Sequence, residues 1–206
     1  EGGANTVTVI SMGPERATEA ARKALSMGAN DAILISDPVL AGADAVVTAE
    51  VLANVILKGE FDIVICGTES TDARMSVVPA MMSEKLGCAQ LTFASKVSVD
   101  PGAKKVSITR VTEAGVDEVH GEFPCVISVV EKINEPRYPS FKGIMAAKKK
   151  VIDVRDFAST GAQFTKSWSA VVDSAPRPPR AGGVVVTDDG TAGQKLVDFL
   201  SEKKLI

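Results

Sequence analysis

The chain has 206 residues and a formal net charge of −3 at pH 7, and 45% of its residues are hydrophobic and 24% charged. These proportions are ordinary for a soluble globular protein, and the length suffices for one well-buried domain with an appendage. The small net charge gives no reason to expect nucleic acid or a membrane surface as the main partner. No apolar run approaches the roughly 18 to 20 residues of a spanning helix, and the residues after Glu1 do not resemble a signal peptide, so membrane insertion is not expected.

The cysteines and the histidine limit the chemistry that the chain can perform. Cys66, Cys88 and Cys125 show no CxxC spacing, and an odd number of cysteines without metal-ligand spacing fits a reducing, cytoplasmic setting. His120 is the single histidine, which argues against a His-based metal site or a Ser-His-Asp triad. The sequence therefore predicts neither catalytic nor metal-binding residues.

Residues 6–86 alternate between short apolar runs and helical patterns. Strands are predicted at residues 6–10, 31–36 and 61–66, and helices at residues 15–27, 44–57 and 76–86. The helix over residues 44–57 is apolar nearly all round and is therefore expected to be buried. This alternation indicates right-handed βαβ units and an α/β fold with a parallel sheet covered on both faces.

The pattern changes after Gly87. β-branched or alternating runs at residues 92–99, 105–112 and 116–123 are separated by turn signals that contain Gly102 and Gly115. They predict a β-meander or a pair of hairpins over residues 91–123. The apolar run at residues 125–130 could then rejoin the main sheet.

From Asn134 onward the regular patterns are lost. Residues 157–183 are rich in Ser, Ala, Gly and Pro, and residues 175–180 are expected to be extended. A short amphipathic helix is predicted over residues 194–204. Such an arm either is a flexible tail or binds the surface of another protein, and the sequence pattern alone does not decide between these two interpretations.

The best candidate for a ligand site lies where the third predicted strand ends. In open α/β sheets, ligands bind beyond the carboxyl ends of the strands, where loops meet helix N-termini. Residues 66–76 read CGTESTDARMS, so the segment offers a glycine for close backbone approach, the hydroxyls of Ser70, Thr71 and Ser76, Asp72, and a helix start that suits a phosphate. Residues 11–13 could line the same crevice. Because neither a GxGxxG motif nor a P-loop is present, these loops alone do not establish nucleotide binding.

Residues 131–150 carry a more specific signature. They read EKINEPRYPSFKGIMAAKKK, which resembles the signature of electron-transferring flavoprotein β-subunits, also called FixA proteins, where Asn-Glu-Pro-Arg-Tyr and Ile-Met-x-Ala-Lys-Lys-Lys occur at this spacing. The segments SMGP, ALSMGA, ICGTESTD and FPCVIS also follow in family order. The resemblance thus covers almost the whole chain.

The resemblance implies a fold and a role. The fold would be a three-layer, parallel-sheet, nucleotide-binding fold of the adenine nucleotide α-hydrolase-like type, with an added antiparallel β-hairpin region and an extended C-terminal arm. The partner would be the FixB-like α-subunit, which holds the redox FAD. The heterodimer would carry electrons from acyl-CoA and related dehydrogenases of fatty acid oxidation to a membrane quinone oxidoreductase, so the chain would be a carrier subunit rather than an enzyme.

The same resemblance implies two binding regions. The β-subunit usually holds an AMP with a structural role, and a docking loop presents an apolar anchor to the dehydrogenase. The residues that match the AMP site are Met12, Gly67, Thr68, Glu69, Ser70, Thr71, Asp72, Ser76, Val77 and Val78. The docking loop spans residues 134–147 with Phe141 at the anchor position, and Tyr138, Ile144 and Met145 are expected to share its docking role.

The expected organisation is a nucleotide-binding domain over residues 1–155 and an arm over residues 156–206 that wraps the partner subunit. The first strand and helix of the family, with part of the nucleotide site, would precede Glu1, and that strand is central to the family's sheet. The sequence is therefore interpreted as a fragment of the polypeptide. Two further sites depart from the family pattern. Many members carry acidic or glycine-rich residues where this chain has residues 73–75, and members often carry glutamate where it has Val111.

Two alternative functions stay open. Members that bifurcate electrons hold a second FAD in the β-subunit, with a loop resembling DGxTAQVG, whereas residues 72–79 read DARMSVVP. AMP is therefore favoured over FAD. A nucleotide-sensing module of the universal-stress-protein type would share the βαβ pattern, but it needs a glycine-rich phosphate loop late in the chain, which Gly182 and Gly183 alone do not supply.

A few side chains have two interpretations. Arg137 could bind a phosphate or a flavin edge, or it could pair with Glu131 or Glu135. Residues 148–150 are either a solvated basic patch or a dock for acidic partners. Tyr138 is expected to pack rather than to take part in redox chemistry, and Cys66 is expected to be a buried small hydrophobic residue.

Overall fold

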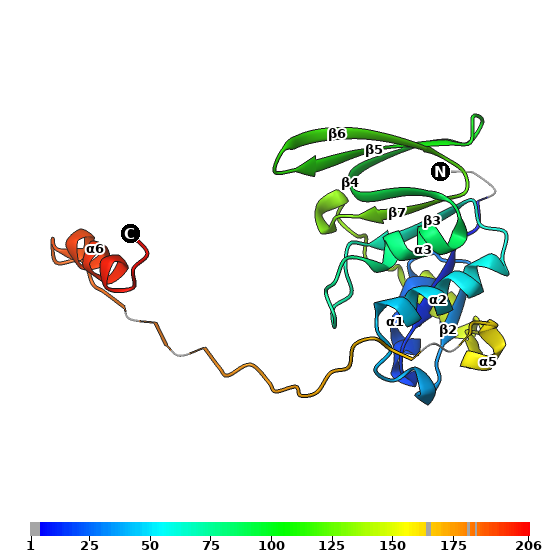
Figure 1. Cartoon of the computed structure of the whole chain (residues 1–206), viewed down its shortest axis with the longest axis horizontal. Coiled ribbons are helices and arrows are strands. Elements are labelled where there is room, and N and C mark those ends of the chain that lie inside the picture. Colours follow the sequence, from blue (N-terminus) through cyan, green and yellow to red (C-terminus); the bar gives the residue numbers. More distant parts are fainter. Residues whose placement is uncertain (1–4, 164–165, 181, 184) are drawn as a thin grey trace. The chain divides into compact units, whose positions relative to one another are not determined.

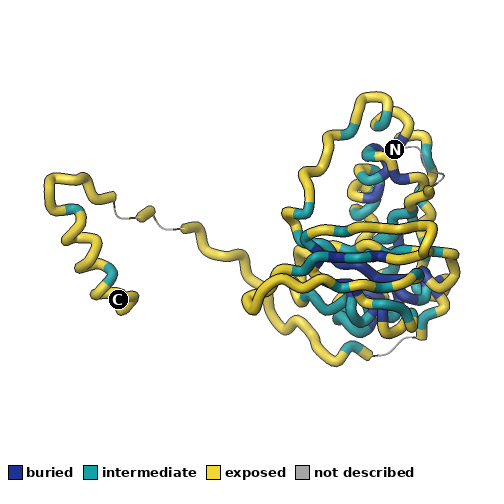
Figure 2. The backbone as a smooth tube through the Cα atoms, turned by 90° about the horizontal axis from the view of Figure 1, so that it is seen from above, coloured by how far each residue is buried: buried dark blue, intermediate teal, exposed yellow. Residues whose placement is uncertain are grey.

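A computed structural model describes residues 5–163, 166–180, 182–183 and 185–206 of the chain. The chain divides into two units, Glu1–Val171 and Val172–Ile206 (Figure 1). The first unit continues beyond residue 155, the boundary expected from the sequence, because Phe157 of the short helix α5 (Phe157–Thr160) packs against its core. Buried backbone is concentrated in this first unit, whereas the second is exposed almost throughout (Figure 2).

The first unit contains a small parallel sheet. Its strands are β1 (Thr8–Met12), β2 (Asp31–Ile35) and β8 (Asp153–Arg155), in the order β1-β2-β8. β1 extends two residues beyond the predicted strand, so Ser11 and Met12 belong to it rather than to a turn. β8 was not predicted, since three residues give too short a pattern to recognise.

Helices cover both faces of this sheet. Alternate residues of β2 point to opposite faces: Ala32 packs with α1 (Thr18–Ser26), and Ile35 packs with α2 (Ala45–Leu57). Two short 3-10 helices, Glu15–Ala17 and Pro38–Leu40, flank these elements, and a third, Glu131–Ile133, lies between residue 130 and the segment that leads to Phe141. The prediction of a helix-covered parallel sheet is confirmed for this part of the fold.

The helix α2 is the most buried helix of the described chain. Asp44 is its N-cap, and Oδ1 of Asp44 accepts a hydrogen bond from the Val47 N–H at 3.0 Å. The prediction that this helix is buried is confirmed, because six of its residues are buried: Val47, Ala49, Val51, Ala53, Val55 and Ile56. The second carboxylate oxygen of Asp44 accepts from the Trp168 N–H at 2.6 Å, which attaches the end of the first unit to the start of α2.

A second sheet is mixed. Its strands are β3 (Ile63–Gly67), β7 (Cys125–Val129), β4 (Ala89–Asp100), β5 (Lys105–Thr112) and β6 (Gly115–Glu122), in the order β3-β7-β4-β5-β6. β3, β7 and β4 are parallel, whereas β5 and β6 are antiparallel to their neighbours. The apolar run at residues 125–130 therefore rejoins the parallel strands, as predicted.

The two faces of the second sheet are covered differently. The helix α3 (Val78–Leu86) packs on one face together with α2, where Met82 contributes to the buried cluster. β6 curls back over β4, so a β-carbon added to Gly121 would lie 3.1 Å from side-chain atoms of both Ala89 and Leu91. This part of the sheet therefore covers itself instead of being covered by helices on both faces.

The two sheets are separate, although a single parallel sheet was expected. Among the described residues, β1 pairs with β2 and β3 pairs with β7, and each leaves one edge unpaired. A hollow of about 140 Å³ lies between them and is lined by Ile10 of β1, by residues 63–66 and by apolar side chains of α2 and α3.

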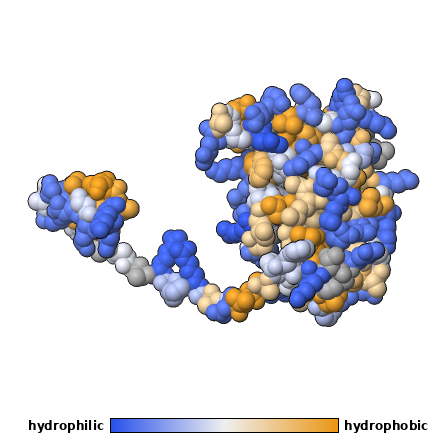
Figure 3. All heavy atoms as spheres, in the orientation of Figure 1, coloured by the Kyte–Doolittle hydropathy of each residue, from blue (hydrophilic) through white to orange (hydrophobic). Residues whose placement is uncertain are grey.

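Regular structure continues beyond Asn134, where the sequence predicted an irregular chain. The helix α4 (Phe141–Lys149) packs on α1, and Ala147 is buried in their contact. In the second unit the helix α6 (Ala192–Glu202) is present as predicted, with exposed apolar side chains gathered on one side of it (Figure 3). In the part of the chain that the structure describes, every helix is too short or too polar to cross a bilayer.

Candidate functional site

The loop predicted to bind a nucleotide leaves the carboxyl end of β3 and enters α3. Thr68, the first residue after β3, donates from Oγ1 to the carbonyl oxygen of Val129 at 2.8 Å. Val129 is the residue of β7 that pairs with Gly67. Residues 69–75 are exposed. The loop is therefore fixed to two parallel strands where it begins and then projects into solvent.

Two residues of this loop have left-handed backbone conformations. The φ angle is 50° at Arg74 and 57° at Ser76, a region that residues other than glycine seldom occupy. Oγ of Ser76 lies 3.3 Å from Oε2 of Glu69, to which it donates. Because a left-handed residue cannot continue an α-helix, α3 begins at Val78, and the prediction that Ser76 starts this helix was wrong.

Asp72 stabilises the tip of the loop. Its Oδ1 accepts from the Ala73 N–H at 2.7 Å. Hydrogen bonds from the Ser70 hydroxyl and from the Ala73 N–H lower the pKa of this carboxyl group, so it is ionised at neutral pH. A ligand hydroxyl can donate to this carboxylate, whereas a phosphate placed beside it would be repelled.

The loop has some of the features that a nucleotide requires. A β-carbon on Gly67 would meet nothing within 4 Å, so a ligand can approach the backbone there. The hydroxyls of Ser70 and Thr71 are exposed, and the start of α3 leaves the Val78 N–H without an intrahelical partner. Pro79, which follows, has no N–H to offer. The residues thus fit the hydroxyl-rich part of a nucleotide better than they fit a phosphate cluster.

Met12 is the last residue of β1, so it lies at the carboxyl end of its strand, as Gly67 does in β3. Its side chain is partly buried and packs with the cluster formed by Ile35 and α2. Val77 is the N-cap residue of α3. The structure therefore places the predicted nucleotide residues at strand ends and at a helix start.

The residues predicted to dock a partner lie on and beside α4. The predicted docking loop at residues 134–147 is helical from Phe141 onward, and the N-cap Ser140 accepts from the Gly143 N–H at 3.0 Å. Phe141, Ile144 and Met145 are spaced i, i+3 and i+4 and therefore share one side of the helix. The expectation of an irregular loop was wrong for this half of the segment.

The side chains of this helix face are exposed. Phe141 is 79% exposed and Tyr138, just before the helix, is 94% exposed, while Ile144 and Met145 are exposed to a lesser degree. Tyr138 was expected to pack, and it makes little contact with the part of the chain that the structure describes. We call these four side chains the α4 surface. A cluster of large, exposed and mostly apolar side chains such as the α4 surface is typical of a protein-binding site.

Two basic residues near α4 have partners that the sequence did not predict. Nη2 of Arg137 donates to the carbonyl oxygen of Met27 at 2.6 Å, rather than pairing with Glu131 or Glu135. Nζ of Lys150 donates to the carbonyl oxygens of Ala29 and Asn30, at 2.7 Å each. Of the run at residues 148–150, only the first two lysines are fully exposed.

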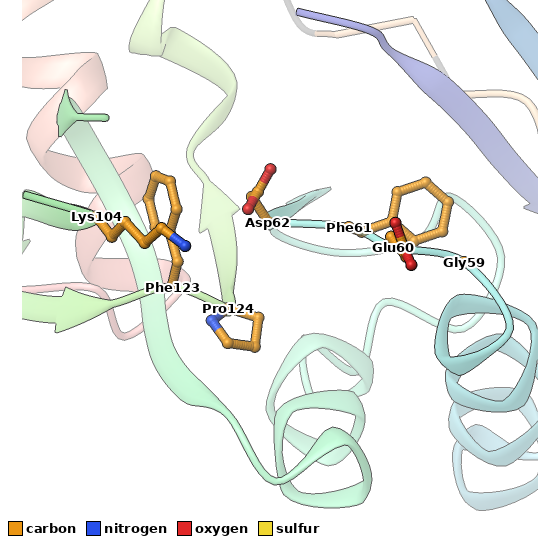
Figure 4. A pocket seen from close by; sticks show the side chains of 7 residues that line it. All are labelled: Gly59, Glu60, Phe61, Asp62, Lys104, Phe123 and Pro124. Carbon is orange, nitrogen blue, oxygen red and sulfur yellow. The ribbon is translucent and has the colours of Figure 1, made fainter. Parts of the chain in front are cut away.

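A surface hollow of about 400 Å³ lies elsewhere. Figure 4 shows its lining, which comes from the segment before β3 and from the ends of β5 and β7: Gly59, Glu60, Phe61, Asp62, Lys104, Phe123 and Pro124. These residues lie at the amino end of β3, opposite to the loop after Gly67. Since ligands in such sheets bind at the carboxyl ends of the strands, this hollow is not the predicted nucleotide site.

Comparison with known proteins identifies the family. The sequence model of the family described as "Electron transfer flavoprotein domain" matches residues 1–160. "Electron transfer flavoprotein subunit beta" from Mycobacterium tuberculosis is 45% identical over 98% of this chain and 77% of its own length, and the subunit of that name from Megasphaera elsdenii is 34% identical over 96% and 77%. "Caffeyl-CoA reductase-Etf complex subunit CarD" from Acetobacterium woodii is 31% identical over 97% and 79%. The chain therefore belongs to the family of electron transfer flavoprotein β-subunits.

Proposed function

We propose that the chain is the β-subunit of a heterodimeric electron carrier that docks dehydrogenases through α4. Membership of the family supports a role in electron transfer. The observation that carries the docking role is the exposure of Phe141, which is 79% accessible although it begins a helix. Large apolar side chains at the centre of an interface commonly supply most of its binding energy. Acyl-CoA dehydrogenases are the proposed donors, and a membrane quinone oxidoreductase is the proposed acceptor.

The redox FAD would be held mainly by a FixB-like α-subunit, and the present chain would hold an AMP. The exposed hydroxyls of Ser70 and Thr71, the open space above Gly67 and the free N–H of Val78 support a nucleotide beside the loop after β3. In this arrangement the carboxylate of Asp72 would accept from a ribose hydroxyl. The bound AMP would hold the loop in place and would take no part in redox chemistry.

The nucleotide loop and the segment that leads to α4 would begin side by side on the fold. The loop begins after Gly67 in β3, and the segment that leads to α4 begins after Val129 in β7. These two residues pair in adjacent parallel strands. A nucleotide that orders the loop would therefore also stabilise the start of the segment that carries the docking residues.

The second unit would bind the α-subunit. Its helix α6 carries exposed apolar side chains, among them Leu196, Val197 and Phe199, spaced on one side of the helix. An amphipathic helix without a packing partner in its own unit is suited to a groove on another protein. Residues 156–206 would in this way form the arm that wraps the partner.

One alternative has a specific observation in its favour. The relative from Acetobacterium woodii is named as a subunit of a caffeyl-CoA reductase complex, which suits a β-subunit that works inside a larger enzyme. In the bifurcating alternative, the present chain would hold its own FAD. The loop sequence counts against this alternative, because Arg74 and Met75 do not fit the DGxTAQVG-like loop that would hold this FAD. The universal-stress-type alternative has no such support.

The experiment is to purify the chain with its α-subunit, denature the complex, and quantify the released nucleotides by mass spectrometry. One FAD and one AMP per heterodimer are expected. Two FAD without AMP would replace the simple carrier by the bifurcating alternative. ATP bound by the β-subunit without a flavoprotein partner would instead favour the nucleotide-sensing module.

A further inference from the structure

Basic side chains connect α1 and α4 in both directions. From α1, Nη1 of Arg22 donates to the carbonyl oxygen of Ala147 at 2.6 Å and also to that of Lys150. From the end of α4, Nζ of Lys150 donates to the carbonyl oxygens of Ala29 and Asn30, which follow α1. Each cation thus donates to backbone carbonyl groups at or beyond the end of the other helix.

These contacts matter because α4 has only a small packing contact with α1, which is made through Gly143 and Ala147. Of its nine residues only Ala147 is buried, and a buried methyl group contributes little apolar contact. The large side chains Phe141, Ile144 and Met145 are exposed and cannot hold the helix in place. Hydrogen bonds from a charged donor are about twice as strong as neutral ones, and cations are favoured at the carbonyl end of a helix. Arg22 and Lys150 therefore contribute to the placement of α4, together with the close approach of Gly143 to Ser26.

We propose that Arg22 and Lys150 are positioning residues, which hold α4 on α1 so that the α4 surface meets a partner protein in one fixed orientation. The proposal rests on the proposed docking function of α4. A helix freed from α1 would have to become ordered again on binding, and this loss of conformational freedom weakens association. Electron transfer within the bound complex would not be affected, because neither side chain belongs to the α4 surface.

Because Arg22 and Lys150 are half-buried, a positioning role can be distinguished from direct contact with the partner protein. The donors of Arg22 and Lys150 are directed to backbone carbonyls of their own chain, whereas Lys148 and Lys149 are exposed. A long-range attraction of acidic partners would depend on the exposed lysines as much as on Arg22. Lys149→Met is therefore the matched control for loss of one positive charge in the same region.

The experiment uses the complex of the full chain with its α-subunit and a cognate acyl-CoA dehydrogenase. Arg22→Met, Arg22→Lys, Lys149→Met and Phe141→Ala are compared in steady-state reduction of the carrier and in hydrogen exchange of peptides covering residues 141–149 and 45–57. For Arg22→Met we expect a KM for the carrier about three- to tenfold higher, an unchanged kcat and faster exchange in α4 alone. Arg22→Lys, which can reach one carbonyl, should restore part of the KM and part of the protection, whereas Lys149→Met should change neither.

Other results would overturn the proposal in distinguishable ways. Unchanged exchange of α4 in Arg22→Met would show that Arg22 does not hold the helix. Faster exchange with an unchanged KM, while Phe141→Ala still raises KM, would show that the contact has no role in docking. An unchanged KM in both variants would remove the docking function of α4 itself, and with it this role of Arg22. If Arg22→Met does not fold, Lys150→Met is subject to the same comparison.

Discussion

Gly143 of α4 lies so close to α1 that a β-carbon there would come within 2.5 Å of the Ser26 carbonyl oxygen. Ser26 cannot move away easily, because it is the last residue of α1 and is buried. We therefore expect Gly143→Ala to push the two helices apart and to lower the free energy of unfolding by about 1–3 kcal/mol. Urea denaturation of the full chain measures this difference.

The matched control for this variant is Gly193→Ala. Gly193 also lies within a helix, but a β-carbon there would meet nothing within 4 Å. Alanine has the higher helix propensity, so the control should leave the stability unchanged or raise it slightly. An equal loss of stability in both variants would contradict the close approach at Gly143.

Phe141→Ala tests the docking function. Removing the exposed ring should leave the heterodimer and its FAD content intact, since Phe141 makes little contact within its own chain. We expect a loss of about 1–2 kcal/mol in binding to an acyl-CoA dehydrogenase, seen as a higher KM for the carrier in reduction kinetics. Val39→Ala removes another exposed apolar side chain and should have no such effect. Equal rates for Phe141→Ala and the unaltered carrier at subsaturating concentration would exclude Phe141 from docking.

The N-cap Asp44 should give a pH-dependent contribution to stability. Hydrogen bonds, first from the Val47 N–H and then from the Trp168 N–H, lower the pKa of its carboxyl group in the folded chain. Its contribution is therefore fully present above the unfolded pKa, about 3.9, and is lost as the pH falls through the lower, folded pKa. Asp44→Ala should cost about 1 kcal/mol at pH 7 and less at pH 3. Asp44→Asn keeps an acceptor oxygen without titrating, so a similar pH dependence for it would contradict this assignment.

The thiols of Cys66 and Cys125 should be unreactive in the folded chain. Burial raises the pKa of the Cys66 thiol to about 11, although the side chain is only half-buried rather than fully buried as predicted. Burial, together with the neighbouring Cys88, raises the pKa of the Cys125 thiol to about 11. The thiolate, which is the reactive form, is therefore scarce at pH 7.5. Iodoacetamide should label these two residues slowly before unfolding and rapidly in urea, and peptide mass spectrometry would reveal fast native labelling if the assignment were wrong.

Much of the fold could be predicted because buried helices and strands show a periodic spacing of apolar residues in the sequence. Most buried residues of the helix over residues 44–57 and of the parallel strand over residues 125–130 are apolar. The helix α4 gave no such pattern, since its large apolar side chains face solvent and its contact with α1 is made through Gly143 and Ala147. An isolated glycine within a helix is the one signal that could have indicated this close approach.

The site was predicted less completely than the fold. The loop after Gly67 was located from the rule that ligands bind at the carboxyl ends of parallel strands, but the left-handed backbone of Ser76 has no sequence signal. Arg137 and Lys150 looked like ligand-binding or docking residues because their carbonyl partners near the end of α1 lie far away in the sequence. The separation into two sheets could not be predicted either, because strand pairing is a property of the assembled fold.

The helix α2 belongs to the cores of both sheets. Its valines, such as Val51, pack with β2 of the first sheet, whereas Ile56 packs with Val64 of β3 in the second. β1 and β3 share no hydrogen bonds among the described residues, so packing on α2, which Ile10 of β1 joins, couples the two halves. If either half melted, the apolar side of α2 that packs against it would be exposed, so the first unit should unfold in a single cooperative step despite its divided sheet.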